Sequence, residues 1–233
     1  MIAVLAYHSV QETDFAYAVS PEDFERQMKI LKRRFRVITL AELRDILVQG
    51  RMPPDRCATI TFDDGFEDNL TQALPILKEL GLPATLFLTT SYVGRTITTP
   101  SGFTSSCLDW NQARQLDQSG IMDIQSHGHG HLVLTQATEA QAVEDLERGK
   151  ASLEAELKKN IFAYAYPKAR CNDTMKSVVA GYFDMAFAGD GLITDLKVCD
   201  RWRIPRIVVR NHTPDWKFRA RLSPLAWRLK SFL

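Results

Sequence analysis

Hydrophobic and polar residues follow one another along this chain as short apolar runs separated by longer amphipathic stretches. The short runs are rich in β-branched and aromatic residues and predict strands, since such side chains suit a buried pleated surface. They cover residues 2–7, 36–40, 58–62, 84–89, 122–126, 161–166, 184–188 and 207–209. The repeated order of strand, helix and strand favours a parallel α/β fold.

Five amphipathic stretches between these runs predict helices. Proline directly after Ser20 is a typical helix start, and Gly81 is a typical helix stop. The predicted helices cover residues 21–35, 40–50, 69–81, 109–120 and 138–160. Pro75 lies inside the third one and should kink or split it, because proline lacks the N–H that a helix interior uses. No linker or internal repeat divides the chain, so we expect one domain, built as a (β/α) barrel or a doubly wound sheet.

Composition excludes several classes of function. Hydrophobic residues make up 45% of the chain and charged residues 24%, and the net charge of +1 offers no field for a nucleic-acid partner. The four cysteines form no CxxC pair and fit a reducing compartment. The first ten residues have the pattern of a strand and not of a signal peptide, and no apolar stretch is long enough to cross a membrane. We therefore expect a cytoplasmic protein, and no feature specifies an oligomer.

Chemically distinctive residues follow four of the predicted strands at the point where each strand ends. His8 follows the first, Asp63 and Asp64 follow the third, His127 follows the fifth and Pro167 follows the sixth. The carboxyl ends of parallel strands share one face, which carries the active site in barrels and the ligand crevice in open sheets. We expect these residues to lie close together.

Two short motifs at this face predict a metal site. TFDDG (61–65) has two adjacent carboxylates, which repel each other and need a cation, a proton or hydrogen bonds. SHGHGH (126–131) has three histidines, and on one helical turn the rings of His127 and His131 would face a single point. Two imidazoles and one carboxylate bind a divalent metal and leave open positions. The two intervening glycines would let backbone and substrate approach closely.

The motifs TFDDGFEDN (61–69) and SHGHGHLVL (126–134) resemble those of the polysaccharide deacetylase (NodB-homology) family. The resemblance runs from about residue 3 to residue 210 and implies a distorted (β/α) barrel of about seven to eight parallel strands. It also implies metal-dependent removal of acetyl groups from an N-acetylated sugar or glycan. We expect one catalytic domain (1–215), followed by a basic and aromatic segment (216–233).

By position, the resemblance assigns the metal ligands and the catalytic base. Asp64, His127 and His131 match the ligands, and Asp63 matches the base. The implied cofactor is one divalent ion, Zn²⁺ first, with Co²⁺, Ni²⁺, Fe²⁺ or Mn²⁺ as alternatives. His129 falls on a position that does not ligate in the family, so it is a candidate for substrate contact or for supporting the ligands.

The general acid departs from the usual family pattern. The C-terminal Leu-x-His motif has no clear counterpart, and His212 lies in a different context. VLAYHSV (4–10) resembles a branch with permuted motif order, which includes poly-N-acetylglucosamine deacetylases. In that branch the general-acid histidine stands near the start of the domain, and His8 matches it.

The oxyanion motif, usually Arg-x-Pro-Tyr, is the second departure. The chain reads YAYPKAR, with Pro167 retained and Lys168 in place of the tyrosine. Because the donor in the family is a backbone N–H, Lys168 can still supply it to the developing oxyanion. The arginine that orients the base must come from elsewhere in the chain, with Arg170 and Arg206 as candidates, although Arg206 could equally form a structural ion pair.

The implied reaction is hydrolysis of an acetamide, in which Asp63 takes a proton from water and His8 protonates the leaving amine. Tyr7, Tyr166 and Trp110 are candidates for stacking on a sugar or lining its site, although such residues more often belong to the core. The segment 89–107 is long for a connection and could form one lip of the cleft, or a variable surface loop.

Three other functions fit parts of this pattern. A hydrolase of another C–N bond, such as a cyclic imide or ureide amidohydrolase, would use the same scaffold. An iron(II) oxygenase shares the two-histidine, one-carboxylate set, but that function explains neither Asp63 nor the α/β alternation. A catalytically inactive glycan-binding protein would normally lack Asp63 or His8, and this chain has both.

The C-terminal segment 216–233 mixes aromatic and aliphatic residues with basic ones and has no acidic residue. Such a mixture suits peripheral contact with anionic lipid. That contact would place the enzyme at the inner face of a membrane, acting on a lipid-linked acetamido sugar. The alternative is a C-terminal helix that packs on the barrel with its basic face in water. Pro224 limits either helix to short pieces.

Overall fold

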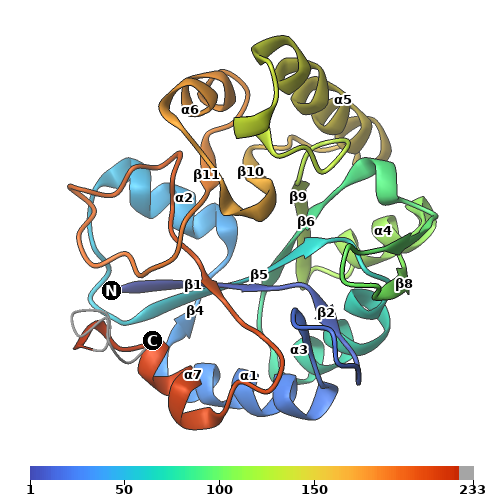
Figure 1. Ribbon diagram of the computed structural model, residues 1–233. Helices are drawn as coiled ribbons and strands as arrows, with labels where there is room; N and C mark the ends of the chain where they lie inside the picture. The colour runs from blue at the N-terminus through green and yellow to red at the C-terminus, as the bar shows by residue number, and fades with distance from the viewer. Residues whose placement is uncertain (226–233) are drawn as a thin grey trace.

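Eight parallel strands form the main sheet of the computed structural model, which describes residues 1–225 (Figure 1). The strand order is β11-β10-β9-β6-β5-β1-β12, and β4 pairs with the first residues of β5. The strands are β1 (Ile2–Tyr7), β4 (Arg36–Val37), β5 (Cys57–Asp64), β6 (Ala84–Leu88), β9 (Met122–Ser126), β10 (Ala163–Ala165), β11 (Met185–Phe187) and β12 (Ile207–Val208). Each of the eight predicted strands is present, several of them shorter than predicted.

The sheet curls so that its two ends approach each other through an irregular segment. Phe187 of β11 forms an isolated parallel bridge with Ile204, and the next N–H, of Ala188, donates to the Ile204 carbonyl at 2.9 Å. β12 begins at Ile207, three residues after Ile204, and pairs with β1. This edge makes the barrel distorted, which confirms the predicted fold.

Helices surround the strands and cover the outer face of the barrel (Figure 1). They are α1 (Pro21–Arg34), α2 (Leu40–Gln49), α3 (Leu74–Leu80), α4 (Trp110–Asp117), α5 (Glu139–Leu157), α6 (Asp173–Ala180) and α7 (Asp215–Arg221), with short turns η1 (Asn69–Ala73), η2 (Thr90–Tyr92), η3 (Leu134–Gln136) and η4 (Pro167–Ala169). The five predicted helices are present. Pro75 lies in the first turn of α3, directly after the π-helical η1, so the predicted third helix is indeed split there.

Successive residues of the strands point to two different cores. Leu5, Tyr7 and Tyr164 belong to the larger cluster, which also contains buried residues of α1, α3 and α5 and therefore lies between sheet and helices. Val4, Phe87 and their neighbours form a smaller cluster on the other face of the strands, which also takes in Leu40 and Leu43 of α2. A side chain on a strand is thus assigned to one cluster or the other by its place in the two-residue alternation.

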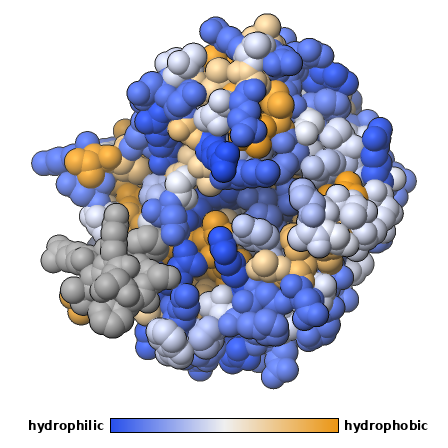
Figure 2. Space-filling model, in the orientation of Figure 1, coloured by the Kyte–Doolittle hydropathy of each residue, from blue (hydrophilic) through white to orange (hydrophobic). Residues whose placement is uncertain are grey.

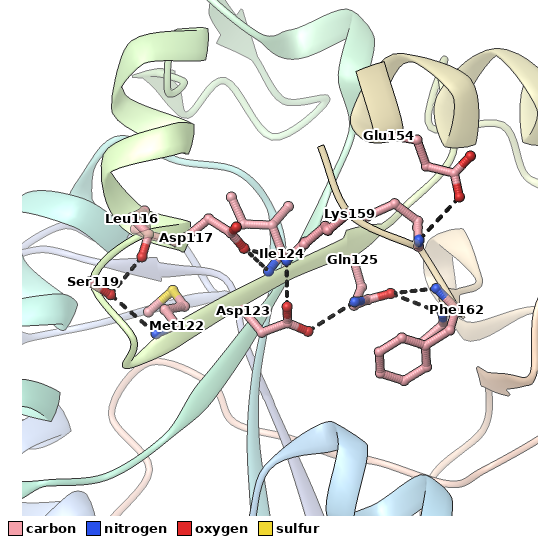
Figure 3. Close-up of polar contacts among 12 residues, drawn as sticks. Leu116, Asp117, Ser119, Met122, Asp123, Ile124, Gln125, Glu154, Lys159 and Phe162 are labelled. Carbon is pink, nitrogen blue, oxygen red and sulfur yellow. Dashed lines mark hydrogen bonds and ion pairs between the residues drawn. The ribbon is translucent and has the colours of Figure 1, made fainter. Parts of the chain in front are cut away.

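A polar network positions β9, the strand that leads into the histidine motif (Figure 3). Lys159 contacts both Asp117 and Asp123, and the Gln125 amide group donates to Asp123 at 2.9 Å. The Gln125 side-chain oxygen accepts the N–H groups of Phe162 and Ala163 at 2.9 and 3.0 Å. These bonds replace ladder bonds between β9 and β10, which share a single register pair, Tyr164 with Ser126.

Two small sheets lie at the edge of the barrel that carries the carboxyl ends of the main strands. β2 (Ser9–Val10) pairs with β3 (Ala18–Val19), and β7 (Thr96–Thr98) with β8 (Thr104–Ser106). The second pair is an antiparallel hairpin inside the segment 89–107, so that segment is partly regular.

The described part of the C-terminal segment packs on the barrel by one side. Phe218 and Leu222 are buried in the helix-layer core, whereas Trp216 and Leu225 are exposed. Residues 226–233, which hold the rest of the predicted membrane-contact segment, lie outside the described residues. Within residues 1–225, no helix has the length and apolar character needed to cross a membrane. All four cysteines are unpaired thiols.

Candidate metal centre and catalytic face

The turn after β5 explains why the motif needs two aspartates and a glycine. Asp64 adopts a left-handed conformation (φ 74°), and Gly65 follows at φ 100°. A β-carbon on Gly65 would lie 2.2 Å from the Leu88 side chain, so only glycine fits. This sharp turn leaves Asp63 fully buried and brings the Asp64 carboxylate toward the histidine loop.

Asp64, His127 and His131 come together, as predicted, in a group whose donor atoms all lie within 4.8 Å of one another. Asp64 Oδ1 is 3.6 Å from His127 Nε2 and 3.4 Å from His131 Nε2. That oxygen is buried and has no hydrogen-bond partner in the described structure. A buried carboxylate oxygen facing two imidazole nitrogens lacks a cation or a proton, so this donor set fits a divalent metal.

The histidine loop does not have the predicted conformation. Residues 127–131 form an irregular loop, so the expectation that a helical turn aligns the two rings is wrong. The chain instead turns at Gly128 (φ 82°) and again at His131 (φ 53°). These two left-handed residues bend the loop back on itself, which brings the rings of His127 and His131 to 5.1 Å between centroids.

The protonation of the three candidate ligands suits metal binding. His127 Nδ1 lies 2.7 Å from the Ala165 carbonyl, which holds the ring so that Nε2 faces Asp64. Burial lowers the pKa of His127 to about 3 and also lowers the pKa of His131. Burial raises the pKa of Asp64 to about 6. Both imidazoles are therefore neutral near pH 7, and the carboxyl is the group whose proton competes with a cation.

Asp63, the predicted base, is held by Arg206. The guanidinium donates two hydrogen bonds of 2.7 Å, one to each carboxylate oxygen, and both side chains are almost fully buried. Burial alone would raise the pKa of Asp63, but the Arg206 charge, with smaller effects of His127 and His8, holds it well below its usual range. Arg206 therefore occupies the orienting position that the sequence left between it and Arg170, which is exposed.

His8 lies beside Asp63 and is not part of the ligand group. Its Nε2 is 4.0 Å from Asp63 Oδ2, and its ring lies 5.0 Å from that of Tyr17. The His8 Nδ1 atom is buried without a hydrogen-bond partner in the described structure. His212, the alternative acid, is exposed at the start of the C-terminal region and makes only local contacts among the bonds resolved here.

The turn η4 carries the predicted oxyanion residues. Pro167 is buried, and Lys168 and Ala169 both adopt left-handed conformations, with φ of 56° and 53°. Two consecutive non-glycine residues in this region are costly, and such strain concentrates at functional turns. The Lys168 charge also lowers the pKa of His131, although burial is the larger cause.

Three predicted substrate contacts have other surroundings. Tyr166 is fully buried in the helix-layer core and packs edge-to-face on Tyr164, so its ring cannot stack on a sugar in this structure. Trp110 is half-buried at the start of α4 and packs against the same core. His129 points away from the ligand group, since its Nδ1 lies 2.8 Å from the Thr90 hydroxyl.

Two half-buried tyrosines that the sequence analysis missed flank the site. The Tyr92 ring stacks on His131 at 5.9 Å between centroids, and Tyr17 lies beside His8. Burial, followed by the Asp64 charge, raises the pKa of Tyr92 to about 12, so its hydroxyl keeps its proton and can donate. Tyr92 follows β6, so the strand-end argument could have identified it.

The face of the molecule seen in Figure 2 is hollowed near its centre and mainly hydrophilic. Phe15 stacks on Phe103 at 4.2 Å, joining the segment after β2 to the β7–β8 hairpin. Beside this contact a pocket of about 590 Å³ is lined by polar residues that include Gln11, Asp68 and Ser105. Ser105 and Ser106 of the hairpin line this pocket, and the candidate metal ligands do not.

Comparison with known proteins identifies the family. A model of the polysaccharide deacetylase family matches residues 50–182. The Bacillus subtilis (strain 168) protein YxkH is 30% identical over 178 residues, which are 76% of this chain and 60% of YxkH. A poly-β-1,6-N-acetyl-D-glucosamine N-deacetylase of Staphylococcus epidermidis is 28% identical over 206 residues, 84% of this chain and 69% of that protein.

The fold agrees with this assignment. The structure of IcaB from Ammonifex degensii matches with a TM-score of 0.82 and 26% identity, covering 95% of this chain and 96% of that one. The family match includes both motifs that build the candidate metal centre, around Asp64 and His127. This chain therefore belongs to the polysaccharide deacetylase family.

Proposed function

We propose that this chain is a metal-dependent hydrolase that removes N-acetyl groups from an acetamido sugar or glycan. One observation carries the proposal: the buried, unpartnered Asp64 oxygen faces two neutral imidazoles, directly beside a carboxylate that is kept ionised. The printed name of the Staphylococcus epidermidis relative, a poly-β-1,6-N-acetyl-D-glucosamine N-deacetylase, supports this substrate class.

Each residue has a distinct task in this reaction. A divalent ion held by Asp64, His127 and His131, with Zn²⁺ as the first candidate, supplies Lewis acidity that lowers the pKa of water. Asp63 accepts the proton of the attacking water, and the two bonds from Arg206 direct its remaining lone pairs.

The leaving amine and the developing oxyanion need further groups. An amine leaves only when protonated, and His8, 4.0 Å from Asp63, is placed to donate that proton. The Lys168 N–H, in its strained turn after β10, is the candidate donor to the oxyanion. Tyr92 packs on His131 and Tyr17 on His8, and the polar pocket lined by Gln11, Asp68 and Ser105 would offer partners for sugar hydroxyls.

Acetate release from N-acetylglucosamine oligomers, of β-1,6 and of β-1,4 linkage, tests the proposal. We expect release that a chelator abolishes, that Zn²⁺ restores and that Asp63→Asn lacks. Release that persists in chelator would disprove the metal dependence. Binding of the oligomers without acetate release would indicate a glycan-binding protein, and turnover of cyclic imides or ureides alone would indicate the other class of C–N hydrolase.

A further inference from the structure

Helix α5 holds the histidine loop through a buried carboxylate. Asp145 Oδ2 accepts the N–H of His129 at 3.1 Å, and Asp145 Oδ1 accepts the N–H of Gly130 at 2.6 Å. Asp145 is 8% exposed, so these are charge-assisted hydrogen bonds in a largely water-free setting. The two amides immediately precede the candidate ligand His131.

The glycines of the loop and of the helix make this contact possible. A β-carbon on Gly128 would lie 2.3 Å from Asp145 Oδ2, and one on Gly130 would lie 3.2 Å from Oδ1. On the helix, a β-carbon at Gly149 would lie 2.7 Å from the Gly128 carbonyl carbon. The loop therefore packs directly on the backbone of α5. The two loop glycines, Gly128 and Gly130, were expected to allow a close approach, and the group that approaches them is the Asp145 carboxylate.

The opposite side of the loop is held by η2. The Thr90 N–H donates to the Gly128 carbonyl at 3.2 Å, and the Ser91 N–H donates to the His129 carbonyl at 2.9 Å. The loop thus lies between η2 and α5, and its conformation includes the unfavourable left-handed His131. These contacts must supply the free energy that holds His131 in that conformation.

We infer that Asp145 and Gly149 are positioning residues for the metal centre: they hold the loop so that the His131 imidazole faces Asp64 before any metal binds. The inference rests on the proposed metal site. Two effects act together, since the carboxylate orders the loop amides and also places a negative charge near the bound dication. Loss of a group that orients a ligand typically weakens metal binding about 10–100-fold.

Titration of the metal-free protein with Zn²⁺ against a competing chelating indicator tests this inference. We expect Asp145→Asn to weaken Zn²⁺ binding by about 10–100-fold, because the amide group cannot accept the second N–H and carries no charge. Gly149→Ala should weaken binding through the steric contact alone. Glu144→Gln is the matched control: Glu144 is exposed on the same helix and bonds to Arg148, so binding should stay unchanged.

Urea unfolding of the same metal-free proteins separates positioning from general stability. A residue that only stabilises the fold would lower the unfolding midpoint and leave the Zn²⁺ dissociation constant of the folded protein unchanged. Unchanged Zn²⁺ affinity in Gly149→Ala, or in a folded Asp145→Asn, would therefore overturn the inference. A wild-type protein that binds no Zn²⁺ would overturn both the inference and the metal site, whereas Zn²⁺ binding without acetate release would overturn only the proposed activity.

Discussion

Neighbouring residues at the candidate centre differ in their hydrogen-bond partners and in their pKa values. Asp63 and Asp64 are adjacent in sequence, yet Arg206 holds the pKa of Asp63 below its usual range while burial raises that of Asp64 to about 6. Geometry separates their roles: Asp64 Oδ1 faces the imidazoles of His127 and His131, whereas both carboxylate oxygens of Asp63 accept hydrogen bonds from Arg206. Three predictions test residues at this scale.

His131→Ala should remove most Zn²⁺ binding, because two ligands remain where a site of this kind needs three. His129→Ala is the control: its ring faces Thr90, so Zn²⁺ binding should persist. Metal content after dialysis, measured by atomic emission, distinguishes the two variants. Full occupancy in His131→Ala together with loss in His129→Ala would mean that the wrong histidine has been assigned to the metal.

Asp63→Asn and His8→Ala should each retain Zn²⁺ and lose activity by about 10²–10⁴-fold, the usual contribution of a proton-transfer group. The two residues face each other at 4.0 Å and neither belongs to the ligand group. Acetate release and metal content measured on the same preparations test this. His212→Ala is the matched control for His8, since His212 is exposed. An active His8→Ala beside an inactive His212→Ala would reverse the assignment of the acid.

Zn²⁺ affinity should fall as the pH is lowered through about 6. The metal-free Asp64 carboxyl has its pKa raised to about 6, so below that pH a proton must leave before the metal binds. His127 does not add to this limb, because burial lowers its pKa to about 3. We expect about a tenfold loss of affinity per pH unit below 6. Equal affinity at pH 7 and pH 5 would contradict the raised pKa.

At the scale of elements, β9 pairs along its whole length with β6, whereas side chains supply most of its bonds toward β10. Gln125 satisfies two backbone N–H groups of the chain entering β10, and Lys159 joins the strand to the end of α4 (Figure 3). Since β9 leads directly into His127, this network also fixes the position of His127 at the candidate metal centre. The sequence shows a glutamine in a predicted strand, but it does not show which backbone groups that glutamine bonds.

Gln125→Ala should lower the free energy of unfolding by about 2–4 kcal/mol, because it leaves two N–H groups of the chain without an acceptor. Gln115→Ala is the control, since Gln115 is exposed on α4 and removal of its side chain should cost little. Urea unfolding followed by circular dichroism provides the measurement. A Gln125→Ala protein as stable as the control would show that β9 is held by other contacts.

At the scale of the whole molecule, helix α7 packs on the barrel and leaves apolar residues exposed around it. α7 lies beside α1, joined by the Arg26–Asp215 ion pair, and buries Phe218. Trp216 is 66% exposed and Leu225 is 65% exposed. Packing on the barrel and contact with a membrane are therefore compatible, because different residues of the segment would serve each.

We expect the full-length protein to sediment with anionic vesicles at low salt, because each basic group near such a surface contributes about 1 kcal/mol. A chain that ends at Leu225 and carries Trp216→Ser should stay in the supernatant, and it leaves the buried Phe218 in place. Neutral vesicles are the control. If the full-length protein also stays in solution with anionic vesicles, the membrane proposal fails, and with it the proposal of a lipid-linked substrate at the inner face.

The amino-acid sequence by itself determined the strands, most helices and the common location of the candidate catalytic residues at the carboxyl ends of the strands. These features are local: a β-branched run predicts a strand wherever it packs, and parallel strands bring their carboxyl ends to one face. For that reason His8, Asp63, Asp64 and His127 could be placed together without coordinates. The residue types alone then pointed to a divalent metal.

Only the tertiary structure decided which distant groups complete the centre. Arg206 lies 143 residues from Asp63 along the chain, and no local pattern distinguishes it from Arg170. Tyr166 faces the helix layer because β10 packs with that register, and a shift by one residue would have turned it inward. Asp145 and Gly149 occupy the buried stripe of α5, where a sequence pattern expects apolar residues, because the loop amides they meet come from another strand end.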